Sequence, residues 1–350
     1  MKKIILLILI FLIPINAYSI STSATSAILM DMDSQRILYA ENIHDVRSVA
    51  SISKVMTAVL AIESGKLDNI VTVGDEINDA YGSAVYIKVG EQLTLRDLVY
   101  ALMLRSGNDA ALVIAEYVGQ DEFVEMMNSK AQEIGMKNTT FNNPCGLDEE
   151  NGNYSTAYDM ALLTSYAMKL EEYRKIVSTK SYTLKTNKNT YVWLNKHRLL
   201  GYSDYITGGK TGFTKKAKRT LITTASQNNL NIVAVTLNDG NDFKDHLNLF
   251  EYGFSNYKNH LILEKGKLNL YDDIYYGIYE LSIEEDIYYP VSNEDNITLK
   301  YTLEEKPKEG DVGSVTLIVN DEEVLRKTIQ SKKITKEQNN NLLDWFKSLW

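Results

Sequence analysis

The chain has few of the residues that build metal, redox or disulfide sites. Among its 350 residues there is one cysteine, Cys145, which has no partner within the chain for a disulfide. No Cys-x-x-Cys pair or Cys/His cluster occurs, and this argues against redox and zinc-finger proteins. The four histidines are scattered, with no ligand spacing such as His-x-x-x-His. We therefore expect neither a metal site nor a cofactor.

Basic residues are also fewer than acidic residues. The chain carries 37 Lys and Arg against 46 Asp and Glu, a formal net charge of −9. Proteins that bind nucleic acid generally present a basic surface, so we do not expect a nucleic-acid partner. A hydrophobic content of 44% is ordinary for a globular protein with real cores. The length leaves room for about two domains.

The apolar run at the N-terminus is too short to span a membrane. Residues 1–3 are a short basic start, and residues 4–15 are nearly all apolar. A membrane helix needs about 20 such residues. Small residues follow, with possible cleavage after Ala17 or Ser19. Residues 1–19 are therefore predicted to be a secretory signal peptide, and the mature protein to work outside the cytoplasm. A buried N-terminal helix or an uncleaved anchor is the alternative interpretation.

Hydrophobic patterning predicts a sheet whose strands come from two distant parts of the chain. Residues 26–41 are typical of a β-hairpin. Two strong β runs lie much later, at 219–225 and 231–237, and a helix over 243–257 follows them. The order of strands, helices, strands and a last helix implies one sheet with a helical cluster inserted.

The segment between these strands is predominantly helical. Ser51 opens an apolar helix that Gly65 ends, and Thr94 is a good N-cap for the next helix. Thr156 and Asp159 have the spacing of a capping box. The later helices are expected at 95–105, 109–118, 121–134 and 157–168.

The last quarter of the chain differs from the rest in composition and in hydrophobic pattern. Residues 259–335 are acidic and rich in tyrosine, with short β-rich runs separated by turns, so we expect a small all-β domain. Residues 336–350 end the chain with leucines, tryptophans and a phenylalanine on one face of an expected helix. This helix is too short to cross a bilayer but suits its interface, where nearby lysines favour anionic lipid. A helix docked on the β domain is the alternative.

One short motif contains residue types that are suited to nucleophilic catalysis. In Ser51-Ile52-Ser53-Lys54 a hydroxyl and an amine lie three residues apart, on one face of a helix. A neutral lysine can take the serine proton and leave a nucleophile that attacks a carbonyl. The helix N-terminus favours both the developing negative charge and a lowered lysine pKa. The same spacing occurs at Ser255 and Lys258, where we interpret it as the tail of a helix.

Two further tripeptides complete a known combination. Ser106-Gly107-Asn108 falls between two expected helices, and Lys210-Thr211-Gly212 lies where a strand should begin. Together with Ser51-x-x-Lys54 they form the triple found in penicillin-binding proteins and class A β-lactamases. The chain resembles the low-molecular-mass penicillin-binding proteins that are serine-type D-alanyl-D-alanine carboxypeptidases of the peptidase S11 family. Besides the triple, the matching segments are residues 1–19, 50–57, 95–98, 143–147, 155–159 and 209–214, the small β domain and the amphipathic tail.

The resemblance implies a fold and a domain order. The fold would be α/β (α+β), with a β-lactamase/transpeptidase-like domain in which an antiparallel sheet packs on a helical cluster. The implied ranges are 1–19 for the signal peptide, 20–258 for the transpeptidase-like domain, 259–335 for the β domain and 336–350 for a membrane-associating helix. The protein would be exported to the outer face of the cytoplasmic membrane or the cell wall space.

The resemblance also implies roles for individual residues. Ser51 would form an acyl-enzyme, and Lys54 would be the general base. Ser106 would relay a proton to the leaving D-alanine, and Asn108 would hold the substrate amide and Lys54. The substrate would be the pentapeptide stem of peptidoglycan, with β-lactam antibiotics as covalent inhibitors. Its terminal carboxylate and reacting carbonyl would be bound by Lys210, Thr211, Gly212 and Phe213, with Arg198 a weaker candidate.

Two departures and two alternatives accompany the resemblance. Lys218 stands where glycine is common in the family, and Phe213 adds no polar side chain beside the expected oxyanion hole. A class A β-lactamase would need a glutamate loop for deacylation, and no Glu-x-x-Leu-Asn segment lies between Asn108 and Lys210. A non-catalytic peptidoglycan-binding homologue would be expected to lose Ser51 or Lys54.

Overall fold

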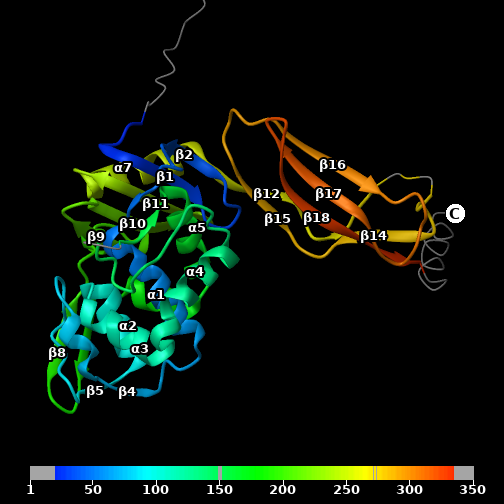
Figure 1. Cartoon of the computed structure of the whole chain (residues 1–350). Coiled ribbons are helices and arrows are strands. Elements are labelled where there is room, and N and C mark those ends of the chain that lie inside the picture. Colours follow the sequence, from blue (N-terminus) through cyan, green and yellow to red (C-terminus); the bar gives the residue numbers. More distant parts are fainter. Residues whose placement is uncertain (1–19, 149–151, 271, 273, 335–350) are drawn as a thin grey trace, which may run out of the picture.

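The computed structural model describes residues 20–148, 152–270, 272 and 274–334. The predicted signal peptide at 1–19 and the predicted helix at 336–350 lie outside the described residues. Figure 1 shows a larger body in which helices pack on a sheet, and an arm of strands that extends from it. In the described part of the chain, no helix has the length and apolar character needed to cross a membrane.

A five-stranded antiparallel sheet forms one layer of the body, with strand order β2-β1-β11-β10-β9. The predicted hairpin and the two predicted late strands are confirmed as neighbours in it. Asn228 and Asn229 connect β10 and β11 with φ values of 52° and 62°, as a tight hairpin turn requires. The strands are β1 (Ala24–Asp31), β2 (Ile37–Glu41), β9 (Ile206–Thr214), β10 (Lys218–Gln227) and β11 (Leu230–Asp239).

Helices cover both faces of this sheet. On one face, α7 (Asp242–Asn256) packs Leu249 and Phe250 against Leu29 of β1. On the other face, Ile28 and alternate residues of β11 contact the helical cluster (Figure 1). Because successive side chains of a strand point to opposite faces, the uninterrupted apolar runs of β1 and β11 supply both cores.

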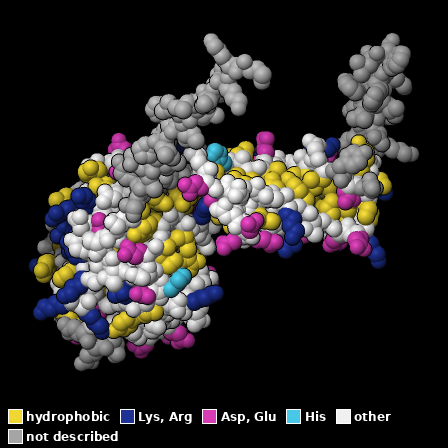
Figure 2. Space-filling view, turned by 90° about the horizontal axis from the view of Figure 1, so that it is seen from above, with side chains coloured by type: hydrophobic (Ala, Val, Ile, Leu, Met, Phe, Trp, Pro, Cys, Tyr) yellow, Lys and Arg dark blue, Asp and Glu magenta, His cyan; other side chains and the backbone are white. Residues whose placement is uncertain are grey.

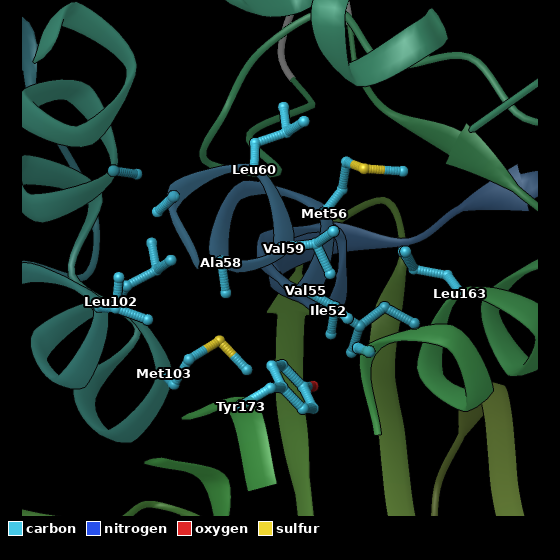
Figure 3. Close-up of a cluster of buried hydrophobic side chains, with 14 of the residues drawn as sticks. Ile52, Val55, Met56, Ala58, Val59, Leu60, Leu102, Met103, Leu163 and Tyr173 are labelled. Atoms are coloured by element: carbon cyan, nitrogen blue, oxygen red, sulfur yellow. The ribbon is translucent and has the colours of Figure 1, made fainter. Parts of the chain in front are cut away.

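Helix α1 (Lys54–Glu63) is the centre of the helical cluster and follows directly from a 3₁₀ turn, η1 (Ala50–Ser53). Its residues 54–61 are all buried. Figure 3 shows this helix surrounded by buried side chains, with Ala58 on the side of Met103 and Val55 on the side of Tyr173. The helices around it are α2 (Leu95–Arg105), α3 (Asn108–Val118), α4 (Phe123–Ile134), α5 (Ala157–Ala167) and α6 (Glu171–Ser178).

Most helix boundaries match the sequence-based expectation, and three details differ. Ser51 lies in the 3₁₀ turn, so the α-helix itself begins at Lys54. Thr156 accepts a hydrogen bond from the Asp159 N–H, but the Asp159 carboxylate accepts from Asn138 N and Thr139 Oγ1, so the capping box is half formed. Helix α6 was not predicted. It is short and its first turn carries two glutamates.

Three two-stranded sheets and three more 3₁₀ turns surround the helices. One of these pairs is a hairpin between residues 181 and 194 that does not join the main sheet. The pairs are β3 (Arg47–Ser48) with β6 (Tyr154–Ser155), β4 (Ile70–Thr72) with β5 (Gln92–Thr94), and β7 (Ser181–Lys185) with β8 (Thr190–Leu194). The 3₁₀ turns are η2 (Asp75–Asp79), η3 (Gln120–Glu122) and η4 (Arg198–Gly201).

The arm is built of strands with a core of its own. Val312, Val315, Leu317 and Ile329 are fully buried in it. Figure 2 shows hydrophobic side chains also gathered along one outer face of the arm. One sheet pairs β12 (Lys258–Leu263) with β15 (Ile287–Val291). The other has the order β13-β14-β18-β17-β16, with β13 (Gly266–Lys267), β14 (Tyr279–Ile283), β16 (Ile297–Leu303), β17 (Gly310–Val319) and β18 (Glu322–Lys333).

Arg36 joins the body to the arm, and Asn259 of β12 adds a hydrogen bond of 2.8 Å to the Asn229 carbonyl. Arg36, in the turn before β2, donates two hydrogen bonds of 2.8 Å to the Asp295 carboxylate and one of 2.6 Å to the Pro290 carbonyl. Its guanidinium also lies 5.2 Å from the ring centre of Tyr257 and 5.4 Å from that of Tyr289. Bidentate pairing and ring contacts together orient the arginine in one geometry.

Candidate active site

The first motif lies where the 3₁₀ turn passes into α1. The turn brings Ser51 Oγ to 3.1 Å from Lys54 Nζ. Ala50 just before it is left-handed, with φ of 51°. Gly146 packs on Ala50 so closely that a Cβ atom at Gly146 would collide with the Ala50 carbonyl. Loop 142–148 thereby lies directly against the turn that presents Ser51, which is a reason for glycine at 146.

Lys54 contacts three oxygen atoms, and the set fixes the direction of its lone pair. Its Nζ lies 2.7 Å from Asn108 Oδ1, contacts the Cys145 carbonyl, and faces Ser51 Oγ. The Asn108 side-chain amine donates to the Tyr81 carbonyl, and this orients its oxygen toward Lys54. A neutral amine has two hydrogens and one lone pair. If the hydrogens go to Asn108 and Cys145, which can only accept there, the lone pair faces the serine hydroxyl.

Burial shifts the Lys54 amine toward its neutral form. The side chain is fully buried, and desolvation lowers its pKa to about 8. The nearby Lys196 charge lowers this pKa further, while Asp109 partly opposes the shift. Lys210 is also buried, and desolvation together with the charges of Lys54 and Lys196 holds its pKa well below the ordinary lysine value. The site thus concentrates three amines with lowered proton affinity.

The second motif connects α2 to α3. Ser106 ends α2 in a left-handed conformation with φ of 64°, and its side chain is buried. Asn108 begins α3, and its N–H donates to the Ser83 carbonyl at 2.7 Å. Since Asn108 also contacts Lys54, this motif joins the catalytic helix to the loop at 80–90. A strained non-glycine residue such as Ser106 is typical of functional sites.

Asp109 holds the neighbouring loop in place. Its carboxylate accepts the N–H groups of Val85 and Tyr86 at 2.7 to 3.1 Å. Tyr86 is itself left-handed, with φ of 63°, and its side chain is largely exposed. Sequence reasoning did not single out Asp109, although it directly follows the second motif. The Asp109 carboxylate binds these backbone N–H groups and does not form an ion pair with Lys54.

The third motif lies on β9 and reaches the catalytic turn. A Cβ atom on Gly212 would lie 2.4 Å from Thr220 Oγ1 and 3.1 Å from the backbone nitrogens of Ser51 and Ile52, so glycine suits this close approach. Thr220, opposite Gly212 on β10, donates to the Val49 carbonyl at 3.1 Å. The edge of β9 therefore runs beside the N–H of Ser51, with Phe213 as the next residue.

Lys210 and the end of β9 are fixed by short-range contacts. Lys210 Nζ donates to the Thr211 carbonyl at 2.7 Å. Asp148 accepts hydrogen bonds from Thr214 Oγ1 and from Ser48 Oγ, and so links β9 to the segment before Ser51. Asp148 was not foreseen from the sequence, because nothing near it in the chain marks the contact.

The departure at Lys218 does not disturb the edge strand. Lys218 adopts φ of 60°, a left-handed conformation in which glycine is easiest. It still pairs with Thr214 across the turn between β9 and β10, and Gly212 keeps its partner Thr220. The chain therefore keeps the register of the third motif, at a strain of about 1–2 kcal/mol.

The structure joins several of the predicted site residues by direct contacts, and the charge that acts on its buried lysines is that of Lys196 and not of Arg198. Ser51, Lys54 and Asn108 are in contact, and Gly212 packs beside Ser51. Arg198 is exposed on η4. Two residues earlier, Lys196 donates to Ser83 Oγ at 3.4 Å and is the cation whose charge acts on Lys54 and Lys210. Lys196 and Arg198 lie two residues apart and are both exposed, so the sequence offered no reason to choose between them.

Cys145 behaves as a small buried residue. Its side chain is buried, its Sγ contacts the Asn108 carbonyl at 3.6 Å, and burial raises its thiol pKa. A thiol with a raised pKa is a poor nucleophile at neutral pH. These observations favour a packing role for the Cys145 side chain. Its backbone carbonyl, in contrast, contacts Lys54. Over the described ranges no group of three or more His, Cys, Asp or Glu side chains could hold a metal ion.

Comparison with known proteins gives consistent matches. Residues 15–241 match the model of the peptidase S11 family, described as D-alanyl-D-alanine carboxypeptidase. The carboxypeptidase DacF of Bacillus subtilis is 33% identical over 255 residues, which are 70% of this chain and 65% of that protein. DacD of Escherichia coli is 33% identical over 321 residues, 84% of this chain and 80% of that protein.

A solved structure matches both the body and the arm. Penicillin-binding protein 5 from Haemophilus influenzae superimposes with a TM-score of 0.76 at 27% identity, covering 89% of this chain and 97% of that one. Coverage of this extent includes most of strands β12–β18 as well as the helical body. The order of body followed by arm is thus shared with a known protein.

Proposed function

This chain belongs to the peptidase S11 family of D-alanyl-D-alanine carboxypeptidases, and on that premise we propose how its residues carry out the reaction. The enzyme removes the terminal D-alanine from peptidoglycan pentapeptide stems through an acyl-enzyme on Ser51. The observation that carries this proposal is the contact of Ser51 Oγ with a fully buried lysine whose other two partners are hydrogen-bond acceptors.

Acylation begins with proton transfer from Ser51 to Lys54. The serine Oγ then bonds to the carbonyl carbon of the penultimate D-alanine, and the carbonyl oxygen takes the electron pair. The N–H groups of Ser51 and Phe213 stabilise this oxyanion, which is the largest electrostatic contribution in acyl transfer. The approach of Gly212 to the Ser51 backbone supports this arrangement, because it puts Phe213 beside the same turn.

The leaving group departs when the C–N bond breaks. Ser106 passes a proton to the D-alanine nitrogen, with Lys54 as its source, and Asn108 holds Lys54 and the substrate amide. Water then attacks the ester carbonyl while Lys54 accepts its proton, and Ser51 recovers its hydrogen as the tetrapeptide leaves. The same lysine thus acts as base and acid in turn.

The cations beside the site bind the terminal carboxylate. Lys210 and Thr211 contact it from β9, and Lys196 adds positive charge from the other side. A carboxylate that enters this site would favour the charged forms of these lysines, because it supplies a negative charge close to them. Arg198 remains a weaker candidate, because the charge that acts on the buried lysines is that of Lys196.

The wider assignment follows from the family. Residues 20–258 would form the catalytic domain and 259–335 the β domain, in line with their separate cores. We expect β-lactams to acylate Ser51, since they present a reactive carbonyl to the same groups. Export by the signal peptide 1–19 and membrane association by residues 336–350 would place the enzyme at the outer face of the cytoplasmic membrane.

A fluorescent penicillin tests the nucleophile. Ser51→Ala should abolish covalent labelling, while Ser255→Ala, which alters the other Ser-x-x-Lys match, should leave it unchanged. Ser255 is exposed at the end of α7, so it is a matched control. Labelling that survives in Ser51→Ala would overturn the assignment.

The products of a muramyl pentapeptide test the reaction itself. Free D-alanine together with a tetrapeptide is expected. A cross-linked product would point to transpeptidation instead, cleavage of cross-linked dimers to endopeptidase activity, and hydrolysis of penicillin with rapid turnover to a β-lactamase. Binding of peptidoglycan without any turnover would favour the non-catalytic alternative.

A further inference from the structure

The end of the arm farthest from the catalytic body carries an apolar turn. Ile274, Tyr276 and Ile278, which we call the tip turn, expose 40%, 61% and 49% of their surfaces. They lie in the connection that leads into β14, at the end of the arm where the C-terminus is marked in Figure 1. Three large apolar side chains exposed within five residues are unusual for a surface that faces only water.

The tip turn is held rigidly in this exposed position. Tyr275, between the exposed residues, is buried in the core of the arm, and its hydroxyl donates to the Glu304 carbonyl at 3.0 Å. The Asp272 carboxylate accepts from Ile274 N at 2.9 Å, and the Asp272 carbonyl accepts from Tyr276 N at 2.9 Å. Anchoring of Tyr275 directs its neighbours outward, so their exposure is a consequence of the fold.

The tip turn also lies beside the last described residue. Ile334 N donates to the Ile278 carbonyl at 3.0 Å, directly after Lys332 and Lys333 complete β18. Sixteen residues remain beyond this point, at 335–350, and their sequence combines leucines and tryptophans with lysines. A segment with that composition is typical of membrane-interface binding. The tip turn therefore lies beside the point from which this segment continues.

The acidic groups at this end are engaged with the arm itself. Glu309 accepts a hydrogen bond from Lys333 N at 3.0 Å, and Glu304 pairs with Lys308 at 2.8 Å. Asp272 is used by the tip turn. Lys332 and Lys333 at the end of β18 supply positive charge next to the tip turn, beside the carboxylates of Asp272 and Glu309, which bind backbone N–H groups.

We propose that the tip turn contacts the lipid surface, so that the protein meets the membrane through the end of the arm as well as through its C-terminal segment. Tyr276 would lie at headgroup level, where tyrosine is enriched, and the two isoleucines would enter the acyl boundary. Two contacts would fix the tilt of the arm, whereas a single anchor would leave it free. This proposal rests on the proposed membrane association of the chain.

A local probe tests the contact separately from anchoring. The full chain carries Ile274→Cys labelled with a polarity-sensitive dye, and Cys145 is buried and so is protected from the label. Ile297→Cys is the matched control, because Ile297 is also 40% exposed but lies at the opposite end of the arm, about 35 Å away along β18. Vesicles containing phosphatidylglycerol should shift the emission at 274 to the blue and leave that at 297 unchanged.

Failure of the tip contact and failure of membrane anchoring give different results in this experiment. If the chain floats with the vesicles but the dye at 274 responds like that at 297, the tip contact is overturned and anchoring stands. If the chain does not float, both are overturned.

Substitution of the tip turn supplies a second measurement. Ile274→Asn, Tyr276→Ser and Ile278→Asn combined should weaken vesicle binding about tenfold. Leu261→Asn, Tyr288→Ser and Ile297→Asn, which alter other exposed apolar residues of the arm, should not. Penicillin labelling checks the catalytic body, which neither set touches, and the far-UV circular dichroism spectrum checks that the arm stays folded. An equal loss in both sets, or no loss in the tip variant, would contradict the proposal.

Discussion

The catalytic centre and the junction between body and arm each depend on a cation, yet their surroundings are opposite. Lys54 is fully buried and contacts a hydroxyl, a side-chain amide and a backbone carbonyl, none of which carries a charge. Arg36 is partly exposed and pairs in two bonds with the Asp295 carboxylate. Burial without a counter-ion lowers the pKa of the lysine, whereas the arginine remains charged.

The difference shows how one chain uses charge for two purposes. A lysine must lose its proton easily to act as a base, and removal of water achieves this at a cost in stability. A link between two cores must hold a fixed geometry, and a bidentate ion pair provides it. The Asp295 carboxyl beside Arg36 accordingly has a pKa well below its usual range, chiefly because of the hydrogen bonds from Arg36. Each of the following experiments alters one side of this comparison.

Replacement of the base should have the largest effect. Lys54→Arg keeps a positive charge but cannot become neutral near pH 8, so acylation by penicillin should fall by about 10³-fold or more. Stopped-flow acylation rates would measure the loss. Lys66→Arg, at an exposed position just after the same helix, should acylate at the wild-type rate. A Lys54→Arg enzyme with near wild-type acylation would show that the neutral amine is not required.

The pH dependence of acylation tests the lowered pKa directly. Since Lys54 must be neutral and its pKa is about 8, the second-order rate should rise about tenfold per pH unit below 8 and level off above it. The profile with a neutral β-lactam ester, which lacks the carboxylate that the other lysines bind, should keep this midpoint. A rate independent of pH between 6 and 9 would contradict a base with this pKa.

Loss of the junction pair should affect stability and leave catalysis unchanged. Arg36→Met, Asp295→Asn and the double variant form a cycle whose coupling free energy in urea unfolding should be about 2 kcal/mol. The pKa of Asp295 is lower in the folded state than in the unfolded chain. The coupling is therefore fully present at neutral pH and declines as the pH falls below about 4.

Penicillin acylation is the control for the junction variants. Its rate should be the same in all members of the cycle, because neither residue contacts the site. A coupling near zero, or slower acylation in Arg36→Met, would show that the junction does not act as described.

The smallest effect is expected at an uncharged buried group. The Tyr173 hydroxyl is buried beside the catalytic helix and has no hydrogen-bond partner among the described residues (Figure 3). Its burial therefore costs free energy, as the burial of Lys54 does. Tyr173→Phe should stabilise the fold by about 1 kcal/mol and leave acylation unchanged. Tyr182→Phe is the matched control. It removes a hydroxyl that donates to Asp97, and it should destabilise. A destabilised Tyr173→Phe would mean that the hydroxyl has a partner, such as water.

Local sequence signals predicted much of the fold. Thr94 and Asp97 form the full capping box that starts α2, and Gly135 ends α4 in a left-handed conformation. The apolar runs of β10 and β11 pair over their whole length. These elements follow from interactions within a few residues, which a sequence displays. Helix α6 escaped notice because it is only eight residues long, and its position depends on packing against α2 and β9.

The sequence by itself determined the identities and spacing of Ser51-x-x-Lys54, Ser106-Gly107-Asn108 and Lys210-Thr211-Gly212, since short motifs need particular side chains at fixed intervals. Only the tertiary structure decided how they meet. Lys54 meets Asn108, and Asp148 meets Thr214, across more than 50 positions of the chain. The same holds for the effect of the Lys196 charge on Lys54 and for the ion pair between Arg36 and Asp295. Contacts and burial of this kind arise from packing, and burial is what gives an ordinary lysine the pKa of a base.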